Sequence, residues 1–198
     1  MAKEHLKKIF LSASIPLFDR DKKFYDTTDV IAIRDAIRAF AAVAIPHTHL
    51  IWGGHPSITP MIRYVMKRMD SNLKRHVTLY QSSFFKDFFP PDNFDFENVI
   101  LTDAEEDREK SLLRMRQQMF KENEFAAAIF IGGMEGVIDE YSLFRISHPT
   151  ALILPVASTG AAARILFNKG ELNYSSRLSN DYAYMSLFRD LLSDYINH

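Results

Sequence analysis

The fold of this chain is decided by the stretch Ala126-Ala127-Ala128-Ile129-Phe130-Ile131-Gly132-Gly133-Met134-Glu135-Gly136-Val137-Ile138-Asp139-Glu140. It begins with an unbroken apolar run, which is typical of a strand buried on both faces of a parallel sheet. Glycines follow directly, and an acidic segment suited to a helix comes after them. Glycines let backbone N–H groups approach a ligand closely, and a helix N-terminus attracts anions. We therefore expect a strand over 126–131, a glycine-rich turn and a helix that form part of a pocket for a nucleotide or phosphosugar.

The rest of the chain alternates strand-like apolar runs with helical patterns, which favours a mainly parallel sheet covered on both faces. We expect further strands over 8–12, 49–52, 77–80, 99–101 and 151–156. We expect helices over 29–44, 57–68, 103–123 and 181–196, and one more after each of the strands 126–131 and 151–156. The Phe-rich connection 82–98 is expected to be loop-like, with a short helix within it left open. The sequence thus predicts an α/β fold, a doubly wound Rossmann-like domain that spans residues 1–198 as one unit.

The composition excludes several classes of protein. The chain has 198 residues and a formal net charge of −1, so it lacks the bulk positive charge that drives non-specific nucleic-acid binding. It has no Cys, which excludes disulfides and thiolate metal sites. No apolar run reaches the roughly 18–20 residues of a membrane helix, and the N-terminus lacks the apolar run of a signal peptide. We therefore expect a cytoplasmic protein that binds neither a membrane nor nucleic acid.

The histidines do not suggest a metal centre. The 7 His residues are scattered along the chain. His47 and His49 would share one face of a strand, but no other metal-ligating residue accompanies them, and we interpret them as structural. We expect no metal site and no cofactor.

Four loops are expected at the carboxyl ends of the strands, where an open parallel sheet binds its ligands. Their ligand-binding candidates are glycines, hydroxyl-bearing residues and their immediate neighbours: Ser12, Ser14, Gly53, Gly54, His55, Gly132, Gly133, Met134, Glu135, Gly136, Glu140, Ser158, Thr159 and Gly160. Hydroxyls and free backbone amides can bind phosphate. Structural alternatives stay open, because the glycines can serve tight packing and Glu140 can complement the helix dipole. Ser158 and Thr159 are expected to cap their helix in any case.

With these residues the sequence resembles the SLOG superfamily, named for the Smf/DprA and LOG (Lonely Guy) proteins. The LOG enzymes carry Pro-Gly-Gly-x-Gly-Thr-x-x-Glu after a central strand. Here Gly132, Gly133 and Gly136 fall on the family glycines, and Glu140 falls on the terminal Glu. Arg116, in Arg116-Gln117-Gln118-Met119, lies near the Arg of the family motif Arg-Lys-x-x-Met, although the Lys is absent.

The sequence also departs from the LOG pattern. Ile131 stands in place of the proline, one extra residue separates the glycine pair from Gly136, and Val137 replaces the Thr. The first loop reads Ser12-Ala13-Ser14 in place of a glycine-rich turn. In these features the chain looks more like the sensory SLOG branch. That branch occurs with Sir2 and TIR domains in bacterial anti-phage systems, and it is associated with ADP-ribose-derived or cyclic nucleotide signals.

The resemblance implies two alternative functions. The first is binding of a nucleotide or ADP-ribose-derived signalling ligand, in signalling or anti-phage defence, with a separate effector protein as partner. The second is a LOG-like phosphoribohydrolase that cleaves the N-glycosidic bond of a nucleoside monophosphate, with Glu140 and Arg116 as catalytic residues. The departures from the LOG pattern favour the first.

A third hypothesis is a scaffolding subunit whose partner surface is the Phe-rich segment 84–94. The chain holds 16 Phe and 8 Tyr, a high aromatic load that suits an oligomer interface as well as a core. Together with the resemblance, this load predicts a homo-oligomer, whose interface the sequence does not locate.

Overall fold

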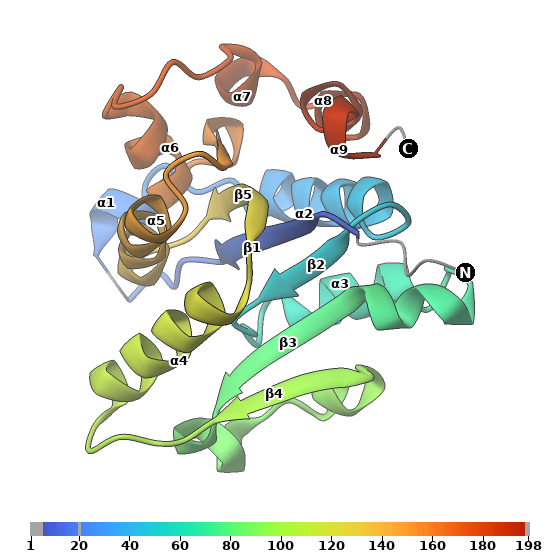
Figure 1. Cartoon of the computed structure of the whole chain (residues 1–198). Coiled ribbons are helices and arrows are strands. Elements are labelled where there is room, and N and C mark those ends of the chain that lie inside the picture. The colour runs from blue at the N-terminus through green and yellow to red at the C-terminus, as the bar shows by residue number, and fades with distance from the viewer. Residues whose placement is uncertain (1–5, 20, 197–198) are drawn as a thin grey trace.

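The computed structural model describes residues 6–19 and 21–196, so the first residues of the expected domain lie outside the described part. Its centre is a six-stranded sheet with the order β4-β3-β2-β1-β5-β6 (Figure 1). The strands are β1 (Lys8–Ser14), β2 (His49–Trp52), β3 (Val77–Ser82), β4 (Asn98–Thr102), β5 (Phe125–Gly132) and β6 (Leu152–Val156). Every neighbouring pair is parallel, which confirms the predicted fold class.

The strand order places a switch point at the centre of the sheet. From β1 the chain moves outward through β2 and β3 to β4, then returns to the other side of β1 for β5 and β6. The connections that leave β1 and β5 therefore lead to opposite faces of the sheet. In open α/β sheets, the crevice outside such a point is where ligands bind.

Helices cover both faces of the sheet (Figure 1). One face packs against α2 (Val30–Ala44), α3 (Thr59–Met66), α7 (Arg177–Asn180), α8 (Tyr184–Leu191) and α9 (Ser193–Ile196). The other face packs against α1 (Lys22–Tyr25), α4 (Arg108–Glu122), α5 (Glu135–Ser147) and α6 (Ala161–Asn168). Among the helices of residues 6–19 and 21–196, none has both the length and the apolar character needed to cross a membrane.

The two cores follow from the alternation of side chains along the strands. In β1, Ile9 and Leu11 face the α2 side, whereas Phe10 faces the α4–α5 side. The Phe10 ring lies 5.0 Å from that of Phe120 and 5.6 Å from that of Phe144, in an aromatic cluster between the helices and the sheet. Ser12 continues the face of Phe10, so its hydroxyl points toward α5 and not toward α2.

The connection between β3 and β4 is not a plain loop, and the short helical structure that the sequence left open is present. It contains two 3-10 helices, η2 (Ser83–Phe88) and η3 (Pro91–Asp95), and a third, η1 (Ser71–His76), precedes β3. Both strands also extend beyond their predicted ends, because Gln81 pairs with Leu101 and Ser82 pairs with Thr102 in the sheet.

The terminal helix predicted over 181–196 is wrong as a single helix. Asp181 accepts a hydrogen bond from the N–H of Ala183 (2.8 Å), which forms a turn before α8 begins at Tyr184. The helix then breaks at Leu192, and α9 follows as a separate short turn. Local side chain-to-backbone bonds of this kind compete with helix formation.

Candidate functional site

The glycine turn after β5 lies at the switch point, next to the end of β1. The N–H of Gly133 donates to the carbonyl of Ser14 (2.8 Å), which joins the two strand ends. Gly132 and Gly133 have φ angles of +57° and +91°, in the region that favours glycine. A Cβ on Gly133 would lie 2.3 Å from Val137, and one on Gly132 would lie 2.5 Å from Ile33. The turn therefore requires both glycines for its shape, whatever it binds.

The first turn of α5 presents backbone donors at this point. Met134 is its N-cap residue, and within the described residues no side chain caps the helix. The N–H of Val137 bonds to the carbonyl of Met134 (3.0 Å), which leaves the amides of Glu135 and Gly136 facing the turn. The Glu135 side chain is exposed and lies 4.0 Å from Lys23. Free amides at a helix N-terminus suit an anion.

Glu140 lies one turn further along α5 and contacts two residues that are distant in sequence. Its Oε1 accepts a hydrogen bond from Nε of Arg116 (3.1 Å), and its Oε2 accepts one from the Ser12 hydroxyl (2.5 Å). The side chains of Arg116 and Glu140 are only 10% and 15% exposed. A buried charge that loses its partner costs about 3–5 kcal/mol, so the two side chains depend on each other. The structure thus brings together the two residues that the resemblance implies as catalytic.

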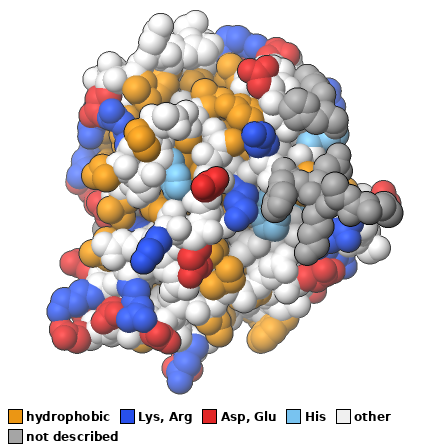
Figure 2. All heavy atoms as spheres, in the orientation of Figure 1, with side chains coloured by type: hydrophobic (Ala, Val, Ile, Leu, Met, Phe, Trp, Pro, Cys, Tyr) orange, Lys and Arg blue, Asp and Glu red, His pale blue; other side chains and the backbone are white. Residues whose placement is uncertain are grey.

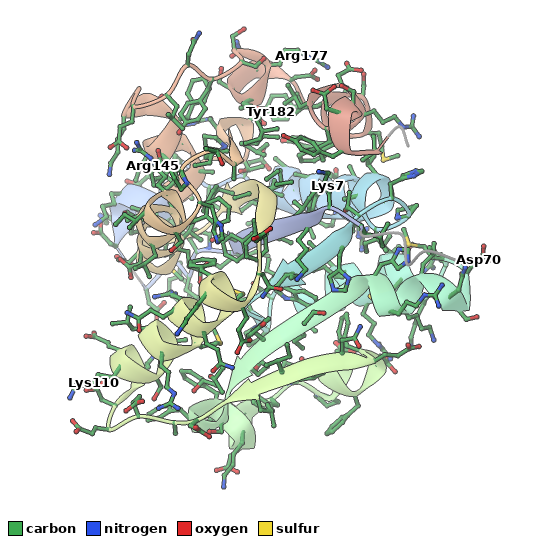
Figure 3. The ribbon with its side chains drawn as sticks, viewed as in Figure 1. Lys7, Asp70, Lys110, Arg145, Arg177 and Tyr182 are labelled. Atoms are coloured by element: carbon green, nitrogen blue, oxygen red, sulfur yellow. The ribbon has the colours of Figure 1, made fainter. Side chains whose placement is uncertain are left out.

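Arg116 also contacts the backbone of the glycine motif. Its Nη2 donates to the carbonyl of Gly136 (3.2 Å), and its Nη1 lies 3.6 Å from Asp139. A Cβ on Gly136 would lie 3.0 Å from Nη2, so the glycine gives the guanidinium room to approach. Arg116 belongs to α4, whose N-cap Asp107 accepts from the N–H of Lys110 (2.8 Å). Figure 3 shows Lys110 at the outer start of this helix, so α4 runs inward toward Arg116.

The loop after β2 adjoins the carboxylate. A Cβ on Gly53 would lie 4.0 Å from Oε1 of Glu140 and 3.1 Å from Met115. Gly54 adopts a φ of +62°, and the Gln81 amide donates to the carbonyls of Gly53 (3.4 Å) and Gly54 (3.2 Å). The sequence analysis missed Gln81, although a polar residue directly after a buried strand was a usable signal. Gln81 fixes the loop that faces Glu140.

His55 follows in the same loop and is half-buried. Its Nδ1 lies 2.8 Å from the Ser57 hydroxyl and accepts from the N–H of Ser57 (3.2 Å), so Nδ1 is the acceptor nitrogen. Burial lowers the pKa of His55, and the nearby charge of Arg108 lowers it further. The lowered pKa favours the neutral ring, and with Nδ1 as the acceptor its proton lies on Nε2.

Ser158 and Thr159, after β6, lie beneath the glycine turn. The Ser158 hydroxyl lies 3.0 Å from that of Tyr184, and both Ser158 and Thr159 are at most 1% exposed. Thr159 Oγ1 donates to the carbonyl of Val156 (2.5 Å) and accepts from the N–H of Gly132 (2.9 Å). Neither residue caps α6, because the N-cap is Gly160, so the predicted capping role is wrong. The Thr159 side chain therefore holds the glycine turn, and Ser158 links the same segment to α8.

The N-terminus of α6 is occupied by the chain itself. The N–H of Ala161 donates to the Thr27 hydroxyl (2.9 Å), and that of Ala162 donates to the carbonyl of Gly133 (3.1 Å). A Cβ on Gly160 would lie 1.7 Å from the Thr27 carbonyl oxygen. The first amides of α6 therefore stabilise the fold, and α5 is the helix whose N-terminus faces the switch point.

The predicted site residues thus form three groups. Ser12 and Arg116 each bond to Glu140, and the turn from Gly132 to Gly136, which is joined to Ser14, adjoins them, as does Gly53. Gly54 and His55 belong to the adjoining loop. Ser158, Thr159 and Gly160 support the turn and the start of α6. Within residues 6–19 and 21–196, no three His, Asp or Glu side chains are arranged to hold a metal ion.

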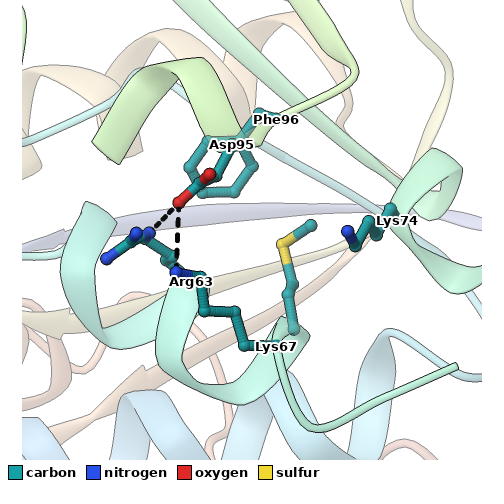
Figure 4. A pocket seen from close by; sticks show the side chains of 6 residues that line it. Arg63, Lys67, Lys74, Asp95 and Phe96 are labelled. Carbon is teal, nitrogen blue, oxygen red and sulfur yellow. Dashed lines mark hydrogen bonds and ion pairs between the residues drawn. The ribbon is translucent and has the colours of Figure 1, made fainter. Parts of the chain in front are cut away.

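A small pocket lies away from this site, between α3, η1 and η3 (Figure 4). Arg63, Lys67 and Lys74 line it, which at first suggests an anion site. Asp95 bonds to Arg63 and lies 3.6 Å from Lys67, and Asp92 lies 2.8 Å from Arg63. Because Asp92 and Asp95 pair with Arg63 and Lys67, most of this pocket is an ion-pair cluster, and the candidate site is the one at the switch point.

Comparisons with known proteins agree with this geometry. A family model described as the SLOG cluster3 family matches residues 23–192. The fold is similar to the solved structure titled the X-ray structure of TM1055, a structural genomics target, with a TM-score of 0.58 and 11% identity over 87% of this chain and 89% of that one. No curated protein matches the sequence.

Proposed function

Because this chain belongs to the SLOG cluster 3 family, we propose that it binds a nucleotide at the switch point between β1 and β5. The observation that carries the proposal is the Arg116–Glu140 pair beside the uncapped first turn of α5. A glycine turn alone serves packing as well as binding. A paired carboxylate held at 15% exposure next to free amides has no comparable role in packing.

Each part of the site matches one part of a nucleotide. The phosphate accepts hydrogen bonds from the amides of Glu135 and Gly136, where the helix dipole favours negative charge. The ribose hydroxyls donate to the Glu140 carboxylate in place of the Ser12 hydroxyl. Arg116 pairs with that carboxylate and orients it.

For the ligand, we propose an ADP-ribose-derived signal, in signalling or anti-phage defence and with a separate effector protein. Since Thr27 and Gly133 already engage the first amides of α6, the second phosphate of such a ligand has to use other donors. The loop of Gly53, Gly54 and His55 supplies them, because it lies beside Glu140 and carries the His55 Nε2–H.

Titration calorimetry tests the binding proposal. We expect micromolar or tighter binding of ADP-ribose or of a related nucleotide such as AMP or cyclic ADP-ribose. Glu140→Gln keeps the size of the side chain but removes its charge, and should weaken binding at least about tenfold. Glu109→Gln, an exposed acid on α4, is the matched control and should bind as the wild type does. The absence of heat with all of these nucleotides would contradict the proposal.

A second candidate function is hydrolysis of a nucleoside monophosphate, favoured by the direct contact of Arg116 with Glu140. Water would add to C1′ of the ribose, and the base would leave with a proton. Glu140 would stabilise the positive charge that develops on the sugar, or orient the water.

Native mass spectrometry separates the two functions after long incubation with AMP, NAD, ADP-ribose and cyclic ADP-ribose. A nucleotide retained intact supports binding alone and identifies the ligand. Free base together with a phosphoribose remnant supports the hydrolase, provided that Glu140→Gln abolishes the cleavage. If AMP stays intact, the hydrolase proposal fails and the binding proposal stands.

A further inference from the structure

β4 is an outer strand whose free edge is suited to pairing. It pairs with β3 on one side, and within the described residues no other strand pairs with its other side (Figure 1). Parallel sheets are normally covered on both faces, yet Val99 is 39% exposed and Leu101 is 59% exposed. Both side chains lie on the same face, since they are two residues apart.

Nothing in the sequence of β4 blocks further pairing. Proteins usually protect an edge strand with a Lys, a Pro, an inward charge or a bulge. The strand reads Asn98-Val99-Ile100-Leu101-Thr102, with none of these residues, and its register with β3 is regular throughout. The edge therefore keeps a straight row of backbone donors and acceptors.

The crossover into β4 adds apolar surface that the nucleotide site does not use. Phe88 is 79% exposed and Phe94 is 88% exposed, and both belong to the Phe-rich segment between β3 and β4. Together with Val99 and Leu101, they make up the exposed apolar surface of β4 and its preceding connection, and such a surface marks an interaction site.

We propose that a second copy of this chain covers this surface, with β4 pairing antiparallel to the β4 of its partner about a two-fold axis. Identical strands can pair in this way because a two-fold interface uses the same patch on both copies. With Ile100 on the axis, Val99 lies opposite the partner's Leu101 on the same face. Such apolar cross-strand pairs stabilise a sheet. The two six-stranded sheets then continue into one.

The charges at the two ends of β4 favour a second copy over an unrelated partner. At the first end, Asn98 donates to the carbonyl of Arg75 (3.0 Å), which places Lys74 and Arg75 of η1 there. At the other end, the side chains of Asp103 and Glu106 are 83% and 80% exposed. Antiparallel pairing sets the basic end of each copy against the acidic end of the other.

Two details qualify the charge pattern. Glu97, just outside β4, is an acidic residue at the basic end and reduces the positive charge there. Figure 2 shows charged side chains of both signs gathered at the lower left, where Figure 1 has the start of α4, so Lys110 and Arg114 offset part of the acidic charge. The complementarity therefore orients the pair, and the apolar contacts supply most of its stability.

Sedimentation velocity on the full chain tests the proposal. We expect the wild type to be a dimer at micromolar concentration and Leu101→Lys to be a monomer. The dissociation constant of the dimer should rise at least about 100-fold, because a Lys charge on a strand edge opposes pairing. Ile146→Lys is the matched control: Ile146 is 80% exposed on α5, away from β4, and its variant should remain dimeric. Circular dichroism verifies that both variants fold.

Charge reversal gives a second measurement. Arg75→Glu should weaken the dimer severalfold, and raising the salt concentration should reduce the difference from the wild type. A wild-type chain that is monomeric at all concentrations would overturn the proposal and leave the surface to another protein. So would a dimer that Ile146→Lys dissociates and Leu101→Lys does not. Either result leaves nucleotide binding, measured separately, unaffected.

Discussion

The Ser12 hydroxyl orients the carboxylate of the candidate site from the neighbouring strand. It lies 2.5 Å from Glu140 and is 1% exposed, so water cannot readily replace it. We expect Ser12→Ala to lower the free energy of unfolding by about 1–3 kcal/mol, because a buried charged acceptor loses its donor. Ser142→Ala is the control, since that exposed hydroxyl bonds only within α5, to Ile138. Urea unfolding of both variants measures the difference, and equal midpoints would contradict the role of Ser12.

At the residue scale, the sequence indicated which residues to expect at the candidate site, but not which of them contact one another. Arg116 and Glu140 are 24 residues apart, and only the resemblance linked them. Their hydrogen bonds depend on how α4 packs against α5, which no local pattern encodes. The Thr27 hydroxyl was missed for the same reason, because its bond to Ala161 spans 134 residues.

The junction of β6 and α6 shows how one glycine can fix the position of an element. Gly160 and Gly170 have similar φ angles of +75° and +63°. A Cβ at Gly160 would collide with Thr27, whereas one at Gly170 would meet no atom within 4 Å. We expect Gly170→Ala to cost about 1–2 kcal/mol from backbone strain alone. Gly160→Ala should cost more than about 3 kcal/mol, because strain and overlap add. Thermal unfolding measures both, and similar losses would show that the contact with Thr27 is unimportant.

At the element scale, the strands were predictable and the connections were less so. Unbroken apolar runs such as Ile129-Phe130-Ile131 have few alternatives in a domain of this size. The segment 82–98 has no such apolar run. Its 3-10 helices depend on short-range hydrogen bonds, such as the one from the N–H of Phe84 to the Ser82 hydroxyl (3.3 Å). The helix end at Leu192 was likewise not predictable, because no glycine or proline marks it.

His49 links the stability of the whole molecule to pH. Burial, with the nearby charges of Lys8 and His76, lowers the pKa of His49 to about 4 from the model-peptide value of 6.5. The unfolded chain therefore takes up a proton before the folded one does, and stability that is present above pH 6.5 is lost as the pH falls toward 4. We expect His49→Gln, which cannot titrate, to show a shallower loss over that range in urea unfolding. A direct NMR titration that places the pKa of His49 near 6.5 would refute this.

At the scale of the whole molecule, the class of fold followed from the sequence but the order of the strands did not. Alternating strands and helices predicted a parallel sheet with helices on both faces. The strand order β4-β3-β2-β1-β5-β6 depends on which strand pairs with which. The strands are similarly apolar, so their sequences do not specify their neighbours. The switch point between β1 and β5, which brings Ser12 to Glu140, is therefore a property of the assembled sheet.

The contacts of Glu140 have a kinetic consequence. In the binding mode proposed above, a ribose hydroxyl replaces the Ser12 hydroxyl at this carboxylate, so Ser12 has to release it first. If that release is slower than diffusional encounter, the observed rate of binding rises with ligand concentration and then levels off at the rate of release. Replacing Ser12 by Ala should abolish the plateau while it weakens the fold. The same hydroxyl that stabilises the domain would then limit the rate at which the ligand binds.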